Sequence, residues 1–178
     1  MKYRRVVLGG TFSLLHAGHR YLLRHALSLA EEVVVGVTSD EFARKLGKSH
    51  PVEPYEVRAL RVLRYCLRKA RRGQRVIIAP IDDIEGPAGS DPAIEAIVAT
   101  EETLVNALKV ALGRLDKGMR PLDVVVVEPL LGPDGEPLSS TKLWRSLQHP
   151  PGYAHEREVP GRDPCGVGGH PEYRAEEA

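Results

Sequence analysis

The fold of this chain is decided by residues 9–19, which read GGTFSLLHAGH. They follow the apolar run Val-Val-Leu at 6–8 and lead into residues 16–30, where apolar side chains recur at helical spacing. A buried strand that turns through glycines into a helix is the place where open parallel sheets bind their ligands. The stretch therefore predicts both an α/β fold and the position of its ligand site.

Further apolar runs alternate with helical patterns up to about residue 150. The runs are continuous, which indicates strands covered on both faces and therefore a parallel sheet with helices between its strands. We expect strands at 6–8, 33–37, 76–81, 96–99 and 124–127. We expect helices at 16–30, 54–72, 101–117 and 140–147. The predicted fold class is α/β, a Rossmann-like, doubly wound sheet of five parallel strands with helices on both faces.

The chain is expected to form one nucleotide-binding domain at 1–150, followed by a C-terminal tail at 151–178. Proline, glycine, histidine and charged residues dominate the tail, and no apolar periodicity runs through it. We therefore expect the tail to be flexible or to lie on the surface. Its His155, Cys165 and His170 fit no standard zinc-ligand spacing, so no metal site is predicted there.

The composition of the chain limits the kinds of partner that we expect it to bind. A hydrophobic fraction of 42% and a charged fraction of 28% are typical of a soluble globular protein, for which we expect a cytoplasmic location. The formal net charge of +1 gives no electrostatic reason to expect a nucleic-acid or membrane partner. An arginine-rich face over residues 58–75 lies opposite an apolar stripe, and we interpret it as solvated rather than RNA-binding.

The residue types in the 9–19 stretch suit a polyphosphate. Gly9 and Gly10 carry no side chain, so backbone amides can approach phosphate oxygens, and the helix start supplies unpaired N–H groups. His16 and His19, three residues apart, fall on nearly one helix face and can each donate an N–H. Gly18 keeps that face open. Taken singly, these residues indicate only a glycine turn and surface histidines; their combination is far more specific.

A second motif, LSSTKL at 138–143, follows the fifth predicted strand and opens the last predicted helix. Hydroxyls and backbone amides at a helix N-terminus again suit phosphate binding, which makes Ser139, Ser140 and Thr141 candidates. The alternative is that one of the two serines simply caps the helix.

The strand, the Gly-Gly-Thr-Phe turn and the His-x-Gly-His helix start together resemble the nucleotidyltransferase superfamily that carries this histidine signature. Within it, the chain is similar to the archaeal and eukaryotic phosphopantetheine adenylyltransferases over roughly residues 4–148. That similarity is carried by GVTSDEFA at 36–43, PYEVR at 54–58, AIVATEET at 96–103 and PLD at 121–123.

The resemblance implies a reaction in which ATP, bound with Mg²⁺, and 4′-phosphopantetheine give dephospho-coenzyme A and pyrophosphate. The acceptor phosphate is already an oxyanion, so the enzyme must chiefly hold two polyanions and stabilise charge on the α-phosphoryl group. By the resemblance, His16 and His19 contact the triphosphate, with His19 nearest the α-phosphoryl group. Thr11 orients the acceptor phosphate or the phosphoryl oxygens.

Other roles stay open between two interpretations. Lys45, Lys48 or Arg58 anchors the acceptor phosphate; otherwise the lysines are solvated and the arginine pairs with an acid. Glu102 contacts the ATP ribose or is an acidic residue that favours a helix start.

The sequence departs from the family pattern in places. Ser13 replaces an aspartate that is common after Thr-Phe, and Trp144 stands where the second motif has an arginine. Lys142 or Arg145 is then the candidate source of that positive charge. These departures keep two alternatives open: a transferase for another acceptor, such as nicotinamide or flavin mononucleotide, and a catalytically silent nucleotide-binding protein.

Overall fold

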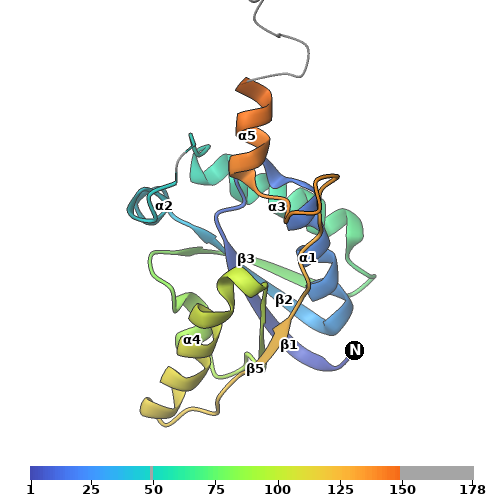
Figure 1. The fold of residues 1–178 in the computed structure, drawn as a ribbon. Coiled ribbons are helices and arrows are strands. Elements are labelled where there is room, and N and C mark those ends of the chain that lie inside the picture. The colour runs from blue at the N-terminus through green and yellow to red at the C-terminus, as the bar shows by residue number, and fades with distance from the viewer. Residues whose placement is uncertain (49, 149–178) are drawn as a thin grey trace, which may run out of the picture.

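A computed structural model of the chain describes residues 1–48 and 50–148. The expected domain at 1–150 is therefore described almost to its end. The expected tail at 151–178, with its His155, Cys165 and His170, lies outside the described residues. Figure 1 shows the fold, with a central sheet and helices packed around it.

The sheet has five strands, all parallel, in the order β3-β2-β1-β4-β5, which confirms the predicted fold class. The strands run longer than the apolar runs where flanking polar residues extend the pairing, as at the start of β1 and β2. Their bounds are Tyr3–Gly10 for β1, Ala30–Thr38 for β2, Arg75–Ile81 for β3, Ala96–Ala99 for β4 and Asp123–Val126 for β5.

Helices cover both faces of the sheet. The bounds are Ala17–Leu29 for α1, Asp40–Lys45 for α2, Tyr55–Lys69 for α3, Leu104–Asp116 for α4 and Ser140–Gln148 for α5. The short α2 has no counterpart in the sequence prediction, because its six residues are too few to show a helical apolar period. Ser39 caps it, and its hydroxyl accepts a hydrogen bond from the backbone amide of Phe42.

Two apolar clusters lie on opposite sides of the sheet. On one side, Leu23 of α1 and Val62 of α3 pack on the strand residues Val6 and Val33. On the other, α4 packs through Val110 and its neighbours on the opposite strand face (Figure 1). Alternate residues of β1 thus point into different clusters, as expected for a strand buried on both faces.

The direction of winding reverses at β1, since β2 lies on one side of this strand and β4 on the other. In doubly wound sheets a crevice opens at such a point, outside the carboxyl ends of the strands. The parallel strands β1 and β4 both end at this edge of the sheet, and α5 stands over it (Figure 1). Within 1–48 and 50–148, no helix combines the length and apolar character needed to cross a bilayer.

Candidate active site

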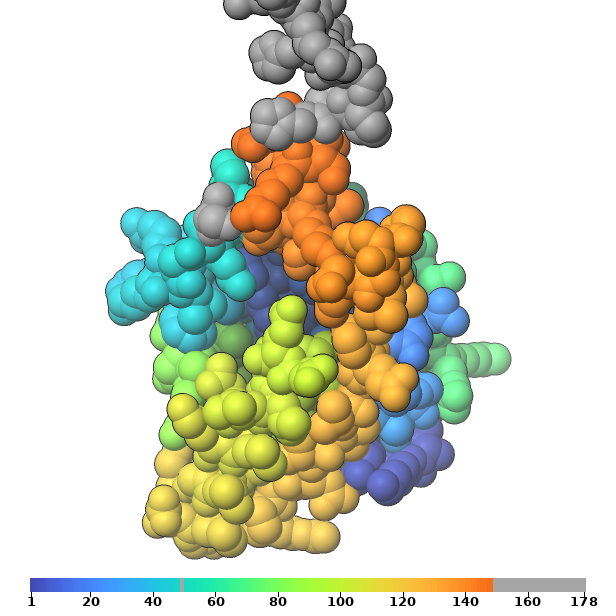
Figure 2. Space-filling model, in the orientation of Figure 1, coloured from blue at the N-terminus to red at the C-terminus, as the bar shows by residue number. Residues whose placement is uncertain are grey.

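A pocket of about 540 Å³, a normal size for a small-ligand site, opens at this crevice. Figure 2 shows a hollow there, with blue N-terminal residues at its floor, between orange α5, cyan α2 and the yellow-green start of α4. Its lining comes from the two motifs found in the sequence, from the segments that follow β4 and β5, and from Lys48 and His50. The lining residues are 9–13, 16, 18, 19, 21, 22, 48, 50, 100–103, 127–130 and 137–141.

The turn between β1 and α1 adopts an unusual backbone. Phe12, Leu14 and Leu15 have positive φ angles of 55°, 58° and 30°, in the left-handed region that non-glycine residues rarely occupy. The buried Phe12 ring fills the space beside Gly10, where an added Cβ would lie 3.1 Å from Phe12 Cε2. Gly10 is therefore needed as much for the Phe12 ring as for an approaching phosphate.

His16 and His19 form one compact pair. Their rings stack with centroids 3.8 Å apart and planes 27° apart, and Phe12 lies 5.2 Å from the His19 ring. The Nδ1 atoms of both histidines are buried and have no hydrogen-bond partner among the described residues. Packing, rather than hydrogen bonding at Nδ1, positions the two rings.

Burial also sets the charge of the pair. It lowers the pKa of His16, and it lowers the pKa of His19 to about 3, with further contributions from His16 and Lys48 that outweigh the opposing effect of Glu53. Both imidazoles are therefore neutral near pH 7. A neutral imidazole can still donate one N–H to a phosphate oxygen, and an approaching polyanion favours its protonation.

Gly18 has a packing role that the sequence only partly indicated. A Cβ at this position would lie 3.1 Å from Cε1 and Nδ1 of His16 and 3.4 Å from the Leu138 carbonyl oxygen. The absence of a side chain therefore lets the His16 ring and the backbone before α5 approach α1 together.

The second motif meets the first at the pocket. Ser139 caps α5, with its hydroxyl accepting from the Lys142 amide at 3.3 Å. Ser140 donates a hydrogen bond of 2.8 Å to the Ser13 carbonyl, and Ser139, Ser140 and Thr141 all line the pocket. The N-terminal end of α5, with its unpaired amides, is thereby held beside the histidine pair.

Neither candidate for the missing arginine lines the pocket. Lys142 pairs with Asp134 at 3.0 Å, and Arg145 is exposed one helical turn from the start of α5. Trp144 is half-buried and stacks near His50, with ring centroids 6.3 Å apart and planes 19° apart. Trp144, at the position where the motif was expected to have an arginine, therefore packs α5 against His50, which lies between α2 and α3.

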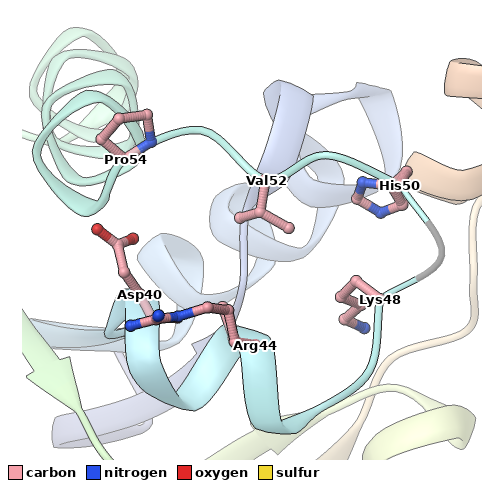
Figure 3. A pocket seen from close by; sticks show the side chains of 7 residues that line it. Asp40, Arg44, Lys48, His50, Val52 and Pro54 are labelled. Atoms are coloured by element: carbon pink, nitrogen blue, oxygen red, sulfur yellow. The ribbon is translucent and has the colours of Figure 1, made fainter.

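The structure places the candidate residues for binding the acceptor phosphate in different surroundings. Lys48 lines both the main pocket and an adjoining pocket of about 350 Å³. Figure 3 shows this second pocket between α2 and the chain leading to α3, with Lys48 and His50 near one another and Asp40 and Arg44 on α2. Lys45 lines neither pocket; its side chain is 65% exposed and pairs with Glu41.

Arg58 lies beneath the site rather than in it. Its side chain is fully buried and donates to the Thr11 and Glu53 carbonyls at 2.9 and 2.6 Å. It also donates to the Thr38 hydroxyl at 3.2 Å and pairs with Asp40 at 2.7 Å. The structure thus favours the ion-pair interpretation of Arg58, and it shows a support for the backbone at Thr11 that the sequence did not indicate.

Glu102 lines the pocket at its exposed rim, in the 3-10 turn Glu101–Thr103 that precedes α4. Its placement is compatible with both interpretations made from the sequence. Thr11 and Gly9 also line the pocket. No group of three or more potential metal-ligating side chains is found within the described ranges 1–48 and 50–148.

Glu53 and His50 are site residues that the sequence analysis did not identify. The Glu53 carboxylate accepts from the Ser13 hydroxyl at 2.8 Å, and His50 lines both pockets. Both lie in a segment without periodicity, so only their nearness to the PYEVR stretch at 54–58 marked this part of the chain.

Comparisons with known proteins agree with this geometry. The cytidylyltransferase-like family matches residues 7–146. A phosphopantetheine adenylyltransferase from Methanopyrus kandleri is 41% identical over 84% of this chain and 94% of its own, and one from Pyrobaculum aerophilum is 40% identical over 84% and 95%. A solved structure from Archaeoglobus fulgidus, described as a protein with unknown function, matches with a TM-score of 0.63 and 32% identity, covering 76% of this chain and 99% of its own.

The family match spans both motifs and residues of all five strands, and the relatives align along almost their full length. The pocket lined by the histidine signature lies where doubly wound sheets bind their ligands. The chain therefore belongs to the cytidylyltransferase-like family of nucleotidyltransferases, and archaeal phosphopantetheine adenylyltransferases are among its relatives.

Proposed function

We propose that this chain transfers an adenylyl group reversibly from ATP to 4′-phosphopantetheine, giving dephospho-coenzyme A and pyrophosphate. The observation that carries the proposal is the meeting of the stacked His16–His19 pair and the α5 N-terminus in one pocket. The acceptor assignment draws on the adenylyltransferases from Methanopyrus kandleri and Pyrobaculum aerophilum, which are about 40% identical to this chain.

The chemistry requires placement and charge stabilisation rather than a strong base. An oxygen of the acceptor phosphate attacks the α-phosphorus of ATP, a new P–O bond forms, and the bond to the bridging oxygen of pyrophosphate breaks. Negative charge develops on the α-phosphoryl oxygens and on the leaving group. The neutral imidazoles of His16 and His19 are suited to donate hydrogen bonds there, and the α5 N-terminus is suited to the leaving phosphates.

The lining of the pocket suits a Mg²⁺ ion that would arrive bound to the phosphates of the nucleotide. Mg²⁺ commonly binds through substrate phosphates, several waters and one or two carboxylates. The pocket offers the carboxylates of Glu101, Glu102 and Glu128 at its lining, without a ready-made cage among the described residues. When bound, the ion would neutralise phosphate charge, while the histidines and backbone amides of this chain orient the same oxygens.

Lys48 is the residue that we assign to the acceptor phosphate. It borders both pockets, so its ammonium group can contact an acceptor phosphate beside the triphosphate while the rest of the acceptor occupies the second pocket. That pocket combines the apolar Ala43 and Val52 with the polar Asp40 and Arg44, a lining suited to an amide-containing chain (Figure 3).

The test is pyrophosphate release from Mg-ATP with 4′-phosphopantetheine, nicotinamide mononucleotide and flavin mononucleotide as rival acceptors. We expect turnover with 4′-phosphopantetheine alone, and a loss of about 10²–10³ in kcat in His19→Ala, as for the removal of one transition-state donor. Turnover with a different acceptor would support nucleotidyl transfer by this chain but refute 4′-phosphopantetheine as its acceptor. Binding of Mg-ATP without turnover of any acceptor would favour the catalytically silent alternative.

A further inference from the structure

The turn that carries the histidine motif is held in place by side chains from other parts of the chain. Its backbone is left-handed at Phe12, Leu14 and Leu15, a conformation that is unfavourable for non-glycine residues and persists only where the surroundings impose it. Arg20 donates to the Leu15 carbonyl at 3.0 Å, and Ser140 donates to the Ser13 carbonyl. Both contacts satisfy carbonyl oxygens of the turn. The Ser13 hydroxyl and the Leu14 amide are donors, and they need an acceptor of their own.

Glu53 supplies that acceptor. Its carboxylate accepts a hydrogen bond of 2.8 Å from the Ser13 hydroxyl. Its two oxygens, Oε1 and Oε2, also accept from the Leu14 amide nitrogen at 3.3 and 3.4 Å. Arg61, on the exposed side of α3, pairs with the same carboxylate at 2.5 Å. Ser13 is 1% exposed and the Glu53 side chain is 18% exposed, so the contact between them is partly buried.

The Glu53 carboxylate is ionised in this position. Burial acts to raise its pKa, but hydrogen bonds from its own backbone amide, from Ser13 and from Arg61 outweigh burial and hold the pKa below its ordinary value. A charged acceptor forms stronger hydrogen bonds than a neutral one, particularly where water is scarce.

The histidine motif does not itself supply a carboxylate at this turn, because position 13 is a serine. An aspartate there would bring its own carboxylate into the turn. Here the carboxylate arrives from 40 residues along the chain, and the small serine leaves room for it and donates to it. A carboxylate is therefore present at the turn, although position 13 does not carry one.

We propose that Glu53 is a positioning residue for the histidine motif, and that it acts through its paired contacts with the Ser13 hydroxyl and the Leu14 amide. Glu53 fixes the left-handed turn, the turn fixes the start of α1 at His16, and His16 stacks on His19. The kinetic consequence rests on the proposed adenylyl transfer, whereas the effects on stability and nucleotide binding rest on the contacts alone.

A double-mutant cycle tests the pair, with the variants Glu53→Gln, Ser13→Asp and the two combined. The matched control is Glu56→Gln, which changes an exposed glutamate of the same region that makes no ion pair among the described residues. The measurements are the melting temperature, the dissociation constant of Mg-ATP, and kcat and KM with 4′-phosphopantetheine as acceptor.

We expect Glu53→Gln to lower kcat by about tenfold to a hundredfold while KM for the acceptor stays within a few-fold, because displaced histidines lose transition-state contacts. Ser13→Asp should lower the melting temperature by about 4 °C or more, since it places two carboxylates in one partly buried space. The combined variant should regain melting temperature and kcat relative to the worse single variant, whereas Glu56→Gln should match the wild type.

Two results would overturn the proposal. Additive losses in the combined variant would show that Ser13 and Glu53 do not share a role. A normal kcat in Glu53→Gln alongside a lower melting temperature would make Glu53 a purely structural residue. If the wild type turns over no acceptor, the proposed function fails by itself, and the cycle is then decided by melting temperature and Mg-ATP affinity, where additivity again refutes the pair.

Discussion

Ser140, the first residue of α5, donates a hydrogen bond of 2.8 Å to the carbonyl of Ser13, which lies 127 residues earlier in the chain. The bond joins the two phosphate-binding motifs predicted from the sequence. It also aligns the N-terminal end of α5 with the turn that positions His16 and His19. The site is thus assembled from segments that are distant in sequence and are linked by few direct contacts.

The Ser140 bond should matter more for nucleotide binding than for stability. Ser140→Ala removes one hydrogen bond, worth about 1 kcal/mol, from a partly buried carbonyl. We expect a small fall in melting temperature and a weaker affinity for Mg-ATP, because α5 is less firmly held over the pocket. Titration of Mg-ATP measures the effect, with Ser146→Ala, on the exposed end of α5, as the control. Equal affinities in both variants would contradict the prediction.

The depressed pKa values of the histidines predict how stability depends on pH. His19 has a pKa of about 3 in the folded protein, lowered from 6.5, so the unfolded chain binds a proton that the native protein does not. The stability due to neutral His19 is present above pH 6.5 and is lost as the pH falls toward 3. The slope is at most about 1.4 kcal/mol per pH unit for one proton.

Thermal unfolding from pH 8 to pH 5, in the absence of nucleotide, measures this dependence. The melting temperature of His19→Asn should fall less steeply below pH 6.5 than that of the wild type, because asparagine does not titrate. Carboxylate titration is common to both proteins and cancels in the comparison. Parallel pH profiles would show that His19 titrates normally in the folded chain.

Gly18→Ala should displace the His16 ring. The added Cβ would lie 3.1 Å from two atoms of that ring, closer than ordinary van der Waals contact. We expect weaker Mg-ATP binding and a kcat lowered by about tenfold or more, as for a displaced catalytic group. Gly113→Ala is the control, since a Cβ there meets nothing within 4 Å on α4 and should stabilise the helix by up to about 1 kcal/mol. Unchanged Mg-ATP affinity in Gly18→Ala would refute the argument.

The two lysines after β2 should behave differently. Lys48→Ala should raise KM for the acceptor by about tenfold to a hundredfold, the loss of one charge-assisted phosphate contact, with KM for ATP much less affected. Lys45→Ala, which removes an exposed pair with Glu41, should leave both constants unchanged. Steady-state kinetics with each substrate varied in turn decide between them. Equal effects of the two substitutions on KM for the acceptor would refute the assignment of Lys48 to the acceptor phosphate.

Arg58→Met should destabilise the fold. It leaves Asp40 and the Thr11, Thr38 and Glu53 oxygens without their donor, and we expect a loss of about 2–4 kcal/mol in the free energy of unfolding. Urea denaturation measures the loss. Arg64→Met, an exposed substitution on the same helix, should change stability by no more than about 0.5 kcal/mol. A stable Arg58→Met protein with a raised acceptor KM would instead place Arg58 in the acceptor site.

The sequence predicted the fold well because the strands are buried on both faces. Continuous apolar runs such as 33–37 can be recognised without tertiary information, and the glycine and histidine motif marked the ligand edge of β1. Local patterns failed where burial is irregular. The α2 helix is too short to show a period, and the expected helix at 101–117 begins with a 3-10 turn before α4.

The roles of single polar residues were harder to predict, because their partners are distant in the sequence. Arg58 belongs to a run of arginines that looks solvated, and only the tertiary structure shows that it is buried and fully paired. The Ser13–Glu53 contact joins a motif to a segment with no pattern at all. Residue type indicates which side chains can bind phosphate, and tertiary packing determines which of them are free to do so.

The separation of Ser13 from Ser140 along the chain also bears on biosynthesis. A nascent polypeptide that has emerged only as far as β5 already holds the histidine motif but lacks the start of α5. Such an intermediate has all five strands, yet it lacks the residues of α5 that complete the pocket lining. A nucleotide bound as proposed would therefore stabilise only those nascent chains from which the start of α5 has already emerged.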